Sequence, residues 1–222
     1  MFSVAIDGPT GAGKSSIAKA LAKRLNFIYV DTGALYRAIG YYALGQKIDV
    51  YNAKEVETLL GDISVSLNYV NKEQRVFLNR EDVTDSIRTE AVSMAASAVS
   101  AHPAIRAFLL DLQRNLSKTS NVIMDGRDIG TVVLPNADVK IFLTATSEER
   151  AKRRLLELKA KGTDANYEEV LKDLIKRDYN DSNRDIAPLK AADDAVIVDT
   201  SELNFNEVLE KLSKIIGEKL KA

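Results

Sequence analysis

The stretch Gly8-Pro9-Thr10-Gly11-Ala12-Gly13-Lys14-Ser15 matches the pattern G-x-x-x-x-G-K-[ST], which is called the P-loop. In such a loop the backbone N–H groups surround the β-phosphate of a nucleoside triphosphate. The lysine, here Lys14, reaches the β- and γ-phosphate oxygens, and the hydroxyl of Ser15 binds a magnesium ion. The motif therefore predicts a site for a nucleoside triphosphate and Mg²⁺.

The residues on either side of the P-loop support this interpretation. Phe2-Ser3-Val4-Ala5-Ile6 is a short apolar run that predicts a buried parallel strand, and the glycine-rich turn follows at once. Apolar residues then recur at helical spacing, at Ile17, Ala18, Leu21, Ala22 and Leu25. The loop is thus expected to join a strand to a helix N-terminus, where N–H groups favour a bound anion.

The composition narrows the class of protein. The chain has 222 residues, is 45% hydrophobic and carries a net charge of −1, so it can bury a full core and lacks the basic excess of a nucleic-acid-binding protein. It has no cysteine, which excludes disulfides, zinc ribbons and thiolate nucleophiles. No apolar run approaches a membrane span, and the N-terminus enters a strand directly. We expect a soluble, cytoplasmic protein that binds neither nucleic acid nor membrane.

Strand and helix patterns alternate along most of the chain. Short apolar runs predict strands at 3–6, 27–30, 122–124, 139–144 and 195–198. Amphipathic patterns predict helices at 14–25, 33–44, 53–60, 90–117 with a break near Pro103, 147–160, 166–184 and 204–220. This alternation is typical of an α/β protein whose parallel sheet is covered by helices on both faces.

One segment departs from this alternation. Residues Ile63 to Tyr69 alternate apolar and polar, a turn is predicted at 71–74, and the strand pattern continues over Arg75 to Leu78 and at Val83. A period of two predicts an antiparallel hairpin or small sheet with one solvent-exposed face. Because it lies between the second and third core strands, the segment is interpreted as an inserted subdomain.

The segment Asp31-Thr32-Gly33-Ala34-Leu35-Tyr36-Arg37 follows the second strand and allows two interpretations. Asp31 or Thr32 could simply cap a helix, with Arg37 in solvent. Alternatively, Arg37 could bind the phosphate of a second substrate, because ligands of parallel sheets bind at the carboxyl ends of the strands. The segment alone does not decide between them.

Asp125-Gly126-Arg127-Asp128-Ile129-Gly130 follows the third core strand. In a P-loop protein, an acid directly after a buried strand is placed to meet magnesium-bound water, which predicts this role for Asp125. Arg127 and Asp128 are expected to project into the same cleft, although two opposite charges could also form a plain surface pair.

Two further groups of charged residues lie on predicted helices. Arg177, Asp181 and Arg184 are spaced i, i+4 and i+7, so they share one helix stripe. Arg150, Arg153 and Arg154 cluster on the preceding helix. Such helices are commonly solvated faces, but arginine forks also neutralise the phosphate oxygens that gather during transfer between two nucleotides.

Together these segments resemble the bacterial cytidylate kinases of type 1, within the P-loop nucleoside monophosphate kinases. The matching strings are the P-loop, 31–37, 125–128, 147–150 and 177–189. The combination is more specific than any single string, since adenylate and shikimate kinases share the loop but resemble the rest poorly. The segment at 62–85 is similar to the enlarged monophosphate-binding subdomain of cytidylate kinases.

The resemblance implies the fold and its division. It implies a three-layer αβα P-loop fold with a five-stranded parallel sheet, an inserted monophosphate-binding subdomain with a small antiparallel sheet, and a short lid. The chain 1–222 would be one kinase unit, and its subregions would be a core at 1–31, 118–152 and 169–222, a monophosphate-binding subdomain at 32–117 with its β-type insert at 62–85, and a lid at 153–168.

The resemblance also implies roles for individual residues. The catalytic residues would be Lys14, Asp125, Arg127 and Arg184. The ATP-binding residues would be Gly8, Pro9, Thr10, Gly11, Ala12, Gly13, Lys14, Ser15, Ser16, Arg153 and Arg154, with Ser15 as the metal ligand. The acceptor-binding residues would be Thr32, Arg37, Ser97, Arg106, Arg127, Asp128, Arg177, Asp181 and Arg184, of which Ser97, Arg106 and Asp128 would contact cytosine.

The expected activity is transfer of the γ-phosphoryl group of ATP to CMP and dCMP, with Mg²⁺, giving ADP and CDP or dCDP. The alternatives are a P-loop kinase with a UMP, AMP or shikimate acceptor and, more remotely, a P-loop switch that binds a partner. A GTP switch usually carries Asn-Lys-x-Asp, whereas the nearest string here, at 71–74, lacks the aspartate. No protein partner is implied, and we expect a monomer.

Overall fold

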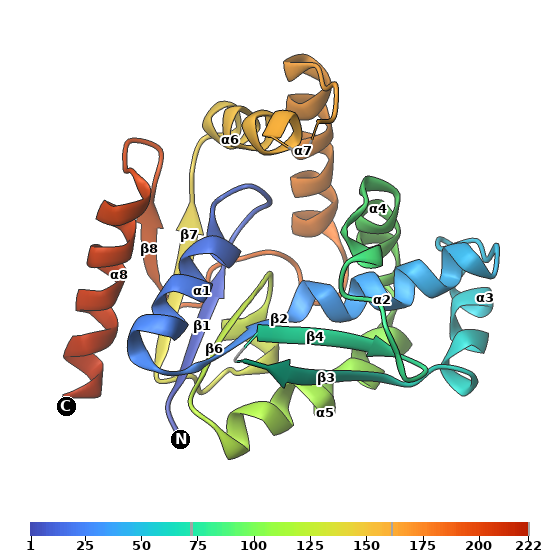
Figure 1. Ribbon diagram of the computed structural model, residues 1–222, viewed down its shortest axis with the longest axis horizontal. Coiled ribbons are helices and arrows are strands. Elements are labelled where there is room, and N and C mark those ends of the chain that lie inside the picture. The colour runs from blue at the N-terminus through green and yellow to red at the C-terminus, as the bar shows by residue number, and fades with distance from the viewer. Residues whose placement is uncertain (72, 161, 222) are drawn as a thin grey trace. The chain divides into compact units, whose positions relative to one another are not determined.

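The computed structural model describes residues 1–71, 73–160 and 162–221 (Figure 1). Lys72 and Lys161, which belong to the predicted insert and the predicted lid, lie outside the described residues. The chain divides into two compact units. Residues 2–27 and 123–222 are called the P-loop unit, and residues 28–122, with Met1, are called the insert unit.

Five strands form the parallel sheet that the sequence predicts, in the order β2-β6-β1-β7-β8. Their bounds are Ser3–Asp7 (β1), Ile28–Asp31 (β2), Val122–Gly126 (β6), Val139–Thr144 (β7) and Val196–Asp199 (β8). All five predicted strands are confirmed, with ends that differ by at most two residues. Residues 4–7 of β1 and all of β6 are buried, as expected for strands covered on both faces.

Within its described residues, the P-loop unit carries four long helices and one short π-helical turn. Their bounds are Lys14–Leu25 (α1), Ser147–Ala160 (α6), Tyr167–Asn183 (α7), Phe205–Leu220 (α8) and Ile129–Val133 (η3). Helices α1 and α8 pack against each other, as do α6 and α7 (Figure 1). The start of α8 is fixed by a capping box, in which Asn204 and Glu207 each bond the other's backbone N–H.

The insert unit holds the remaining helices. Their bounds are Thr32–Gly45 (α2), Ala53–Thr58 (α3), Leu59–Gly61 (η1), Ser86–Arg88 (η2), Glu90–Val99 (α4) and Pro103–Thr119 (α5). The predicted break near Pro103 is confirmed, because α4 ends at Val99 and Pro103 opens α5, where a missing N–H costs nothing. No helix in the described part of the chain is both long and apolar enough to cross a membrane.

The antiparallel sheet of the insert unit contains three strands, Val65–Val70 (β3), Glu73–Leu78 (β4) and Glu81–Asp82 (β5), in that order. This confirms the small antiparallel sheet. The turn predicted at 71–74 is wrong at Glu73 and Gln74, because both belong to β4 and pair with Val70 and Tyr69. The polar side chain of Gln74 favoured a turn in the sequence, but in the structure its amide binds the backbone of Asp31, which lies far away in the sequence.

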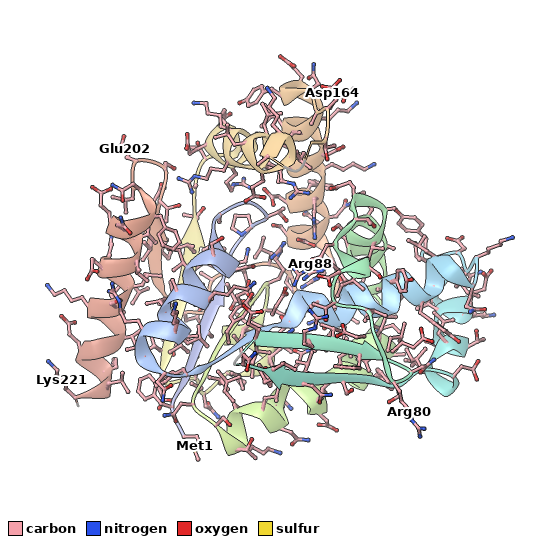
Figure 2. The ribbon with its side chains drawn as sticks, in the orientation of Figure 1. Met1, Arg80, Arg88, Asp164, Glu202 and Lys221 are labelled. Atoms are coloured by element: carbon pink, nitrogen blue, oxygen red, sulfur yellow. The ribbon has the colours of Figure 1, made fainter. Side chains whose placement is uncertain are left out.

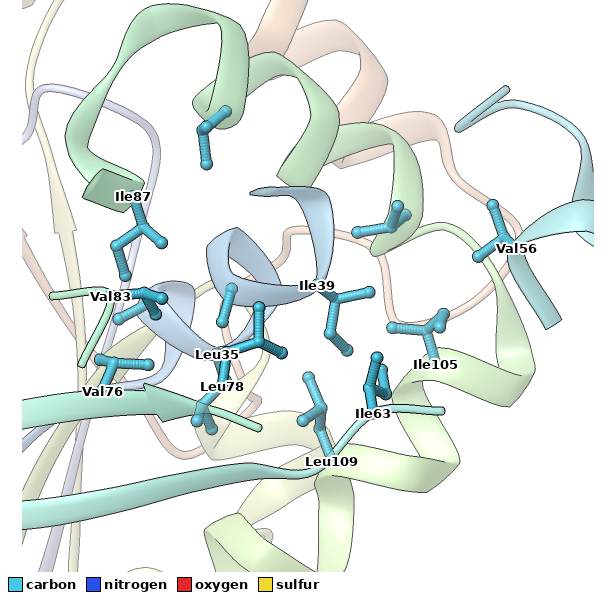
Figure 3. Close-up of a cluster of buried hydrophobic side chains, with 14 residues drawn as sticks. Leu35, Ile39, Val56, Ile63, Val76, Leu78, Val83, Ile87, Ile105 and Leu109 are labelled. Carbon is cyan, nitrogen blue, oxygen red and sulfur yellow. The ribbon is translucent and has the colours of Figure 1, made fainter. Parts of the chain in front are cut away.

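The sheet and helices of the insert unit share one apolar core (Figure 3). Leu35 and Ile39 of α2 are fully buried there, together with Ile105 and Leu109 of α5, and Leu78 of β4 is buried beside them. Burying a leucine or isoleucine side chain stabilises a fold by about 1.5–3 kcal/mol. The core therefore fixes α2, and with it the residues at its N-terminus, against the antiparallel sheet.

Candidate active site

The P-loop lies in the P-loop unit, between β1 and α1, as the motif predicts. Gly8 has φ 147°, and a Cβ at this position would lie 1.9 Å from the carbonyl oxygen of Leu143, so only glycine fits there. Gly13 has φ 86° and is the N-cap of α1, with no side-chain hydrogen bond to the helix N-terminus. The first N–H groups of α1 are thus left to an anion, which is the usual reason that phosphates bind at such a turn.

Lys14 is buried beside these N–H groups, and its Nζ donates a 2.6 Å hydrogen bond to the carbonyl oxygen of Pro9. Burial and the nearby guanidinium of Arg127 lower the pKa of Lys14, while Asp125 and Asp7 act in the opposite direction. A phosphate would supply the negative charge that the buried ammonium group lacks. The position of Lys14 is therefore suited to binding phosphate oxygens.

Ser15 and Asp125 lie together at the start of α1 and near the end of β6. The Ser15 hydroxyl donates a 2.7 Å hydrogen bond to Oδ2 of Asp125. Hydroxyl and carboxylate oxygens are the ligands that Mg²⁺ prefers, and in kinase sites one or two of them act together with substrate phosphates. These two side chains therefore fit a magnesium ion. No group of three or more His, Asp or Glu within the described ranges could hold a metal by itself.

Arg127 follows directly on β6 and joins two other parts of the P-loop unit. Its Nε donates to Oδ2 of Asp181 at 2.8 Å, and its Nη2 donates to the Thr10 hydroxyl at 2.7 Å. Burial alone would raise the pKa of Asp181, but the guanidinium groups of Arg127, Arg177 and Arg184 outweigh it and lower this pKa. The predicted residues of 125–128 and of α7 thus come together, and Arg127 also contacts the P-loop.

Arg184 and Asp128 form a second ion pair in this unit. Nη2 of Arg184 lies 3.6 Å from Oδ1 of Asp128, and both side chains are less than 9% exposed. Nε of Arg184 donates a 2.6 Å hydrogen bond to the carbonyl oxygen of Ala187. A buried guanidinium that contacts a carboxylate at this distance can also bind a phosphate oxygen, because its five N–H groups point in several directions.

Asp7, which the sequence analysis did not single out, anchors the loop that carries Asp128. Its carboxylate accepts hydrogen bonds from the backbone N–H of Ile129 at 2.8 Å and of Gly130 at 2.7 Å. Burial raises the pKa of Asp7 from its ordinary 3.8 to about 6, against the effect of those two hydrogen bonds. Asp7 ends a buried strand, which is the same signal that identified Asp125, so this residue could have been found.

The arginines of α6 behave differently from one another. Arg150 is buried and donates a 2.9 Å hydrogen bond to the carbonyl oxygen of Thr10, so it supports the P-loop. Arg153 donates to Oγ1 and to the carbonyl oxygen of Thr200, at 3.0 and 2.6 Å. Nη1 of Arg154 lies 3.2 Å from Oε2 of Glu157. Arg153 therefore contacts Thr200 and Arg154 contacts Glu157, both within the P-loop unit.

The insert unit carries its own cluster of charges at the N-terminus of α2. Asp31 is the N-cap, and its Oδ1 accepts a 3.0 Å hydrogen bond from the backbone N–H of Ala34. Its Oδ2 accepts hydrogen bonds from Arg37 at 2.6 Å and from Arg88, labelled in Figure 2, at 3.1 Å. Burial favours a higher pKa for Asp31, but the two guanidinium groups outweigh it and lower the pKa.

This geometry confirms the helix cap in the first interpretation of the segment 31–37 but not its solvent-exposed arginine. Asp31 does cap the helix, yet Arg37 is not solvated, since its side chain is only 16% exposed. Nε of Arg37 is buried and has no hydrogen-bond partner among the described residues. Thr32, the first residue of α2, is buried as well. Two guanidinium groups share one carboxylate here, which leaves a local excess of positive charge.

Ser97 and Arg106 lie on the neighbouring helices α4 and α5 of the insert unit. Arg106 is 8% exposed; its Nη1 donates to the carbonyl oxygen of Ser100 at 3.3 Å, and its guanidinium carbon lies 5.6 Å from the centre of the Tyr36 ring. Ser97 is partly buried. Asp128, the third residue expected to contact cytosine, belongs to the P-loop unit.

The chain is similar to known cytidylate kinases over nearly its whole length. The family model described as "Cytidylate kinase" matches residues 4–218. A cytidylate kinase of Caldicellulosiruptor bescii is 50% identical over 214 residues, which are 96% of this chain and 95% of that protein. A cytidylate kinase of Carboxydothermus hydrogenoformans is 49% identical over 216 residues, 97% of each chain.

A solved structure supports the fold alone. A protein of Eubacterium ventriosum, described as uncharacterized, aligns with a TM-score of 0.52 at 12% identity, covering 98% of this chain and 99% of that one. At this level of identity the likeness concerns the order and arrangement of the strands and helices.

Proposed function

The chain belongs to the cytidylate kinase family, and on this premise we propose that it transfers the γ-phosphoryl group of ATP reversibly to CMP and dCMP. The products are ADP and CDP or dCDP. The observation that carries the proposal is the buried Lys14 beside the Ser15–Asp125 pair, in a chain 50% identical to a cytidylate kinase. These groups supply a cation and metal-binding oxygens at a P-loop.

The donor, ATP, binds through the backbone N–H groups of residues 8–15 and of Ser16. Lys14 contacts the β- and γ-phosphate oxygens, and Ser15 and Asp125 would hold Mg²⁺, directly or through water. When bound, this ion neutralises charge that develops on the phosphates. Arg153 and Arg154 reach the nucleotide from the lid, which requires Arg153 to exchange its contact with Thr200. Closure of the lid excludes water that would hydrolyse ATP.

The acceptor phosphate is bound by Arg37, Arg127 and Arg184. In each case the guanidinium contacts a carboxylate, of Asp31, Asp181 and Asp128 respectively. These ion pairs support the proposal, because a carboxylate fixes the orientation of a guanidinium while leaving further N–H groups for a phosphate. Thr32 contributes its hydroxyl beside Arg37. Arg177 and Asp181 lie near the sugar.

The base is recognised by Ser97, Arg106 and Asp128. Cytosine has a carbonyl and a ring nitrogen that accept hydrogen bonds from Arg106, and an exocyclic amine that donates to Asp128. Uracil has a carbonyl in place of that amine, so an acceptor would face an acceptor. The burial of Arg106 and Asp128 strengthens this discrimination, because an unpaired buried polar group is costly.

The transfer is direct and in line. An oxygen of the CMP phosphate forms a bond to the γ-phosphorus of ATP while the bond from that phosphorus to the β,γ-bridging oxygen breaks, and the electron pair leaves with ADP. The loose transition state requires positioning and charge neutralisation more than a strong base. Lys14, Arg127 and Arg184 provide that neutralisation, and Asp125 would help to hold the metal ion, directly or through water.

Both substrates are small molecules, so the reaction needs no protein partner, nucleic acid or membrane. We place it in the cytoplasm and assign it to a monomer. The net charge of −1 and the absence of a membrane-spanning helix in the described part of the chain are compatible with this proposal.

Initial-rate assays with ATP and a panel of acceptors test the function. CMP, dCMP, UMP, AMP and shikimate are each titrated against the wild-type protein. We expect kcat/KM for CMP to exceed that for UMP by at least about tenfold. Asp128→Ala should raise the KM for CMP far more than the KM for ATP.

Two outcomes would contradict the proposal. If UMP, AMP or shikimate is the preferred acceptor, the chain is a kinase of a different substrate. If ATP is hydrolysed slowly and no acceptor increases ADP formation, the chain is a P-loop switch. Equal losses of CMP and ATP affinity in Asp128→Ala would remove this residue from the acceptor site.

A further inference from the structure

Gln74 connects the antiparallel sheet of the insert unit to the end of β2. Its Oε1 accepts a 2.9 Å hydrogen bond from the backbone N–H of Asp31, and its Nε2 donates a 3.2 Å hydrogen bond to the carbonyl oxygen of the same residue. One side-chain amide thus pairs with both backbone polar groups of a single residue, as a neighbouring strand would. The two residues are 43 positions apart in the sequence.

The position of Gln74 in its strand places its polar side chain at the end of an apolar sheet face. Gln74, Val76 and Leu78 alternate along β4 and therefore point to the same face, and Val76 and Leu78 are buried in the apolar core. Opposite them on β3 lie Tyr69, Leu67 and Val65, in register. The inward face of the sheet is thus apolar along its length and becomes polar at one end, at the pair of Gln74 and Tyr69.

Tyr69 makes a second connection to β2. Its hydroxyl donates a 3.3 Å hydrogen bond to the carbonyl oxygen of Tyr29, two residues before Asp31. Burial raises the pKa of Tyr69, so its hydroxyl stays protonated and remains a donor at physiological pH. The polar end of the sheet therefore binds the backbone of β2 at two alternate residues.

The backbone of Asp31 determines where its carboxylate lies, and the carboxylate contacts both Arg37 and Arg88. The arrangement is tight, because a Cβ at Gly33 would lie 3.1 Å from Nη1 of Arg37 and 3.3 Å from Oδ1 of Asp31. A small shift of the Asp31 backbone would therefore change the position of the guanidinium groups. A misplacement of about 0.5 Å is enough to impair the binding geometry of a charged group.

We propose that Gln74 is a positioning residue for the acceptor phosphate, acting through Asp31 on Arg37 and Arg88. The proposal rests on the function assigned above, in which Arg37 binds the phosphate of the acceptor. It gives the antiparallel sheet a role in acceptor affinity, although the function proposed above assigns none of its side chains to the substrate.

A purely structural role would also explain two hydrogen bonds to a backbone, so the test needs a matched control. Thr84→Val is such a control, because the Thr84 hydroxyl accepts a 2.8 Å hydrogen bond from the backbone N–H of Val76 in the same strand. Thr84 is buried, and its hydrogen bonds in the described structure are with Val76 and Asp82 rather than with Asp31 or Arg37. Gln74→Leu and Thr84→Val both remove side-chain hydrogen bonds to a backbone.

The experiment measures KM for ATP and for the acceptor, with the melting temperature as a control for folding. We expect Gln74→Leu to raise the KM for CMP about tenfold and to leave the KM for ATP within about twofold of wild type. Thr84→Val should lower the melting temperature without changing either KM. An unchanged acceptor KM in folded Gln74→Leu, or the same change in both variants, would overturn the proposal.

A double-mutant cycle with Arg37→Ala gives a measurement that a structural role would not affect. If Gln74 acts through Arg37, Gln74→Leu should raise the acceptor KM much less in the Arg37→Ala background than in wild type. Fully additive effects would contradict the proposal.

Gln74→Glu provides a second variant of nearly the same shape. A carboxylate there faces the carbonyl oxygen of Asp31, whereas a protonated carboxyl can both accept and donate, as the amide does. The ratio of its acceptor KM to the wild-type value should therefore fall toward one as the pH is lowered. A ratio that does not depend on pH would count against the proposed contact.

The acceptor in these assays is the one that wild type prefers in the panel. If that acceptor is another nucleoside monophosphate, the assignment of CMP fails while the effect of Gln74 can still be measured. If CMP is preferred and Gln74→Leu behaves like Thr84→Val, the inference fails and the proposed function stands.

Discussion

The P-loop unit and the insert unit present positive charge in different ways. In the P-loop unit, the P-loop supplies backbone N–H groups and Lys14 from one contiguous segment of the sequence. In the insert unit, two guanidinium groups from separate elements share the carboxylate of Asp31. The first arrangement buries a cation, and burial together with the nearby Arg127 lowers the pKa of Lys14 against the effect of Asp125, Asp7 and Asp181. In the second, the carboxylate neutralises part of the charge and the pKa of Asp31 is lowered.

The comparison suggests that the two units tolerate substitution differently. A P-loop depends on one short segment, so a single change should abolish its function. A shared carboxylate depends on several side chains, so each change should have a smaller, graded effect. The following predictions test this difference.

Lys14→Ala should have the largest effect. We expect kcat to fall by about a thousandfold or more, because the ammonium group contacts charge that develops during transfer. The fold should survive, since removing a buried cation also removes its desolvation cost. Steady-state rates and far-UV circular dichroism measure the two effects. Lys19→Ala, on the exposed side of the same helix, is the control. If Lys14→Ala turned over at close to the wild-type rate, the P-loop would not depend on this single residue and the proposed difference between the two units would be wrong.

Asp7→Asn should alter the pH dependence of stability. The pKa of Asp7 is raised to about 6 in the fold, so the native state holds this proton more tightly than the unfolded chain does. The contribution is fully present below the ordinary pKa of 3.8 and is lost as pH rises through about 6. The difference between these two pKa values corresponds to roughly 3 kcal/mol of unfolding free energy.

Urea unfolding between these pH values measures the contribution of Asp7. Wild type should lose this component of stability as the pH rises, and Asp7→Asn should not. Asp62 is exposed, so the variant Asp62→Asn should lose stability with rising pH in the same way as wild type. Identical pH profiles for wild type and Asp7→Asn would show that burial does not raise this pKa.

Asp31→Asn should have the smallest effect, confined to the insert unit. Asparagine still caps α2, but its neutral amide no longer fixes the orientation of the guanidinium groups of Arg37 and Arg88, so the acceptor KM should rise about tenfold while the KM for ATP stays unchanged. The pKa of Asp31 is lowered in the fold, so its contribution to stability is present above the ordinary carboxylate pKa and is lost as pH falls through the lowered value. Kinetics with each substrate varied separately would detect the selectivity, and an equal rise in both KM values would contradict it.

Local sequence predicted most of the P-loop unit. The loop between β1 and α1 is specified by glycines whose conformation no other residue adopts easily, as at Gly8 and Gly13. Ser15 and Asp125 were each predicted to lie at a magnesium site, and the structure joins them by a hydrogen bond. Asp7 also directly follows a predicted buried strand, so the same signal was present. That signal does not reveal that the carboxylate of Asp7 binds the backbone N–H groups of Ile129 and Gly130.

The insert unit was predicted less completely, for a physical reason. The period of two predicted the antiparallel sheet, but Gln74 was assigned to the turn because it is polar and lies next to polar residues. Its strand conformation depends on Asp31, far away in the sequence, which satisfies its amide. The pairing of Arg88 with Asp31 is also a tertiary contact between distant segments. Patterns over a few residues contain no information about such partners.

The most direct test of the account is to measure ATP and CMP binding separately, by calorimetry, to wild type, Lys14→Ala and Arg37→Ala. The account predicts that Lys14→Ala weakens ATP binding and largely retains CMP, and that Arg37→Ala weakens CMP binding and retains ATP. Equal losses of both ligands in both variants, or no loss in either, would contradict the assignment of donor and acceptor phosphates to these two residues.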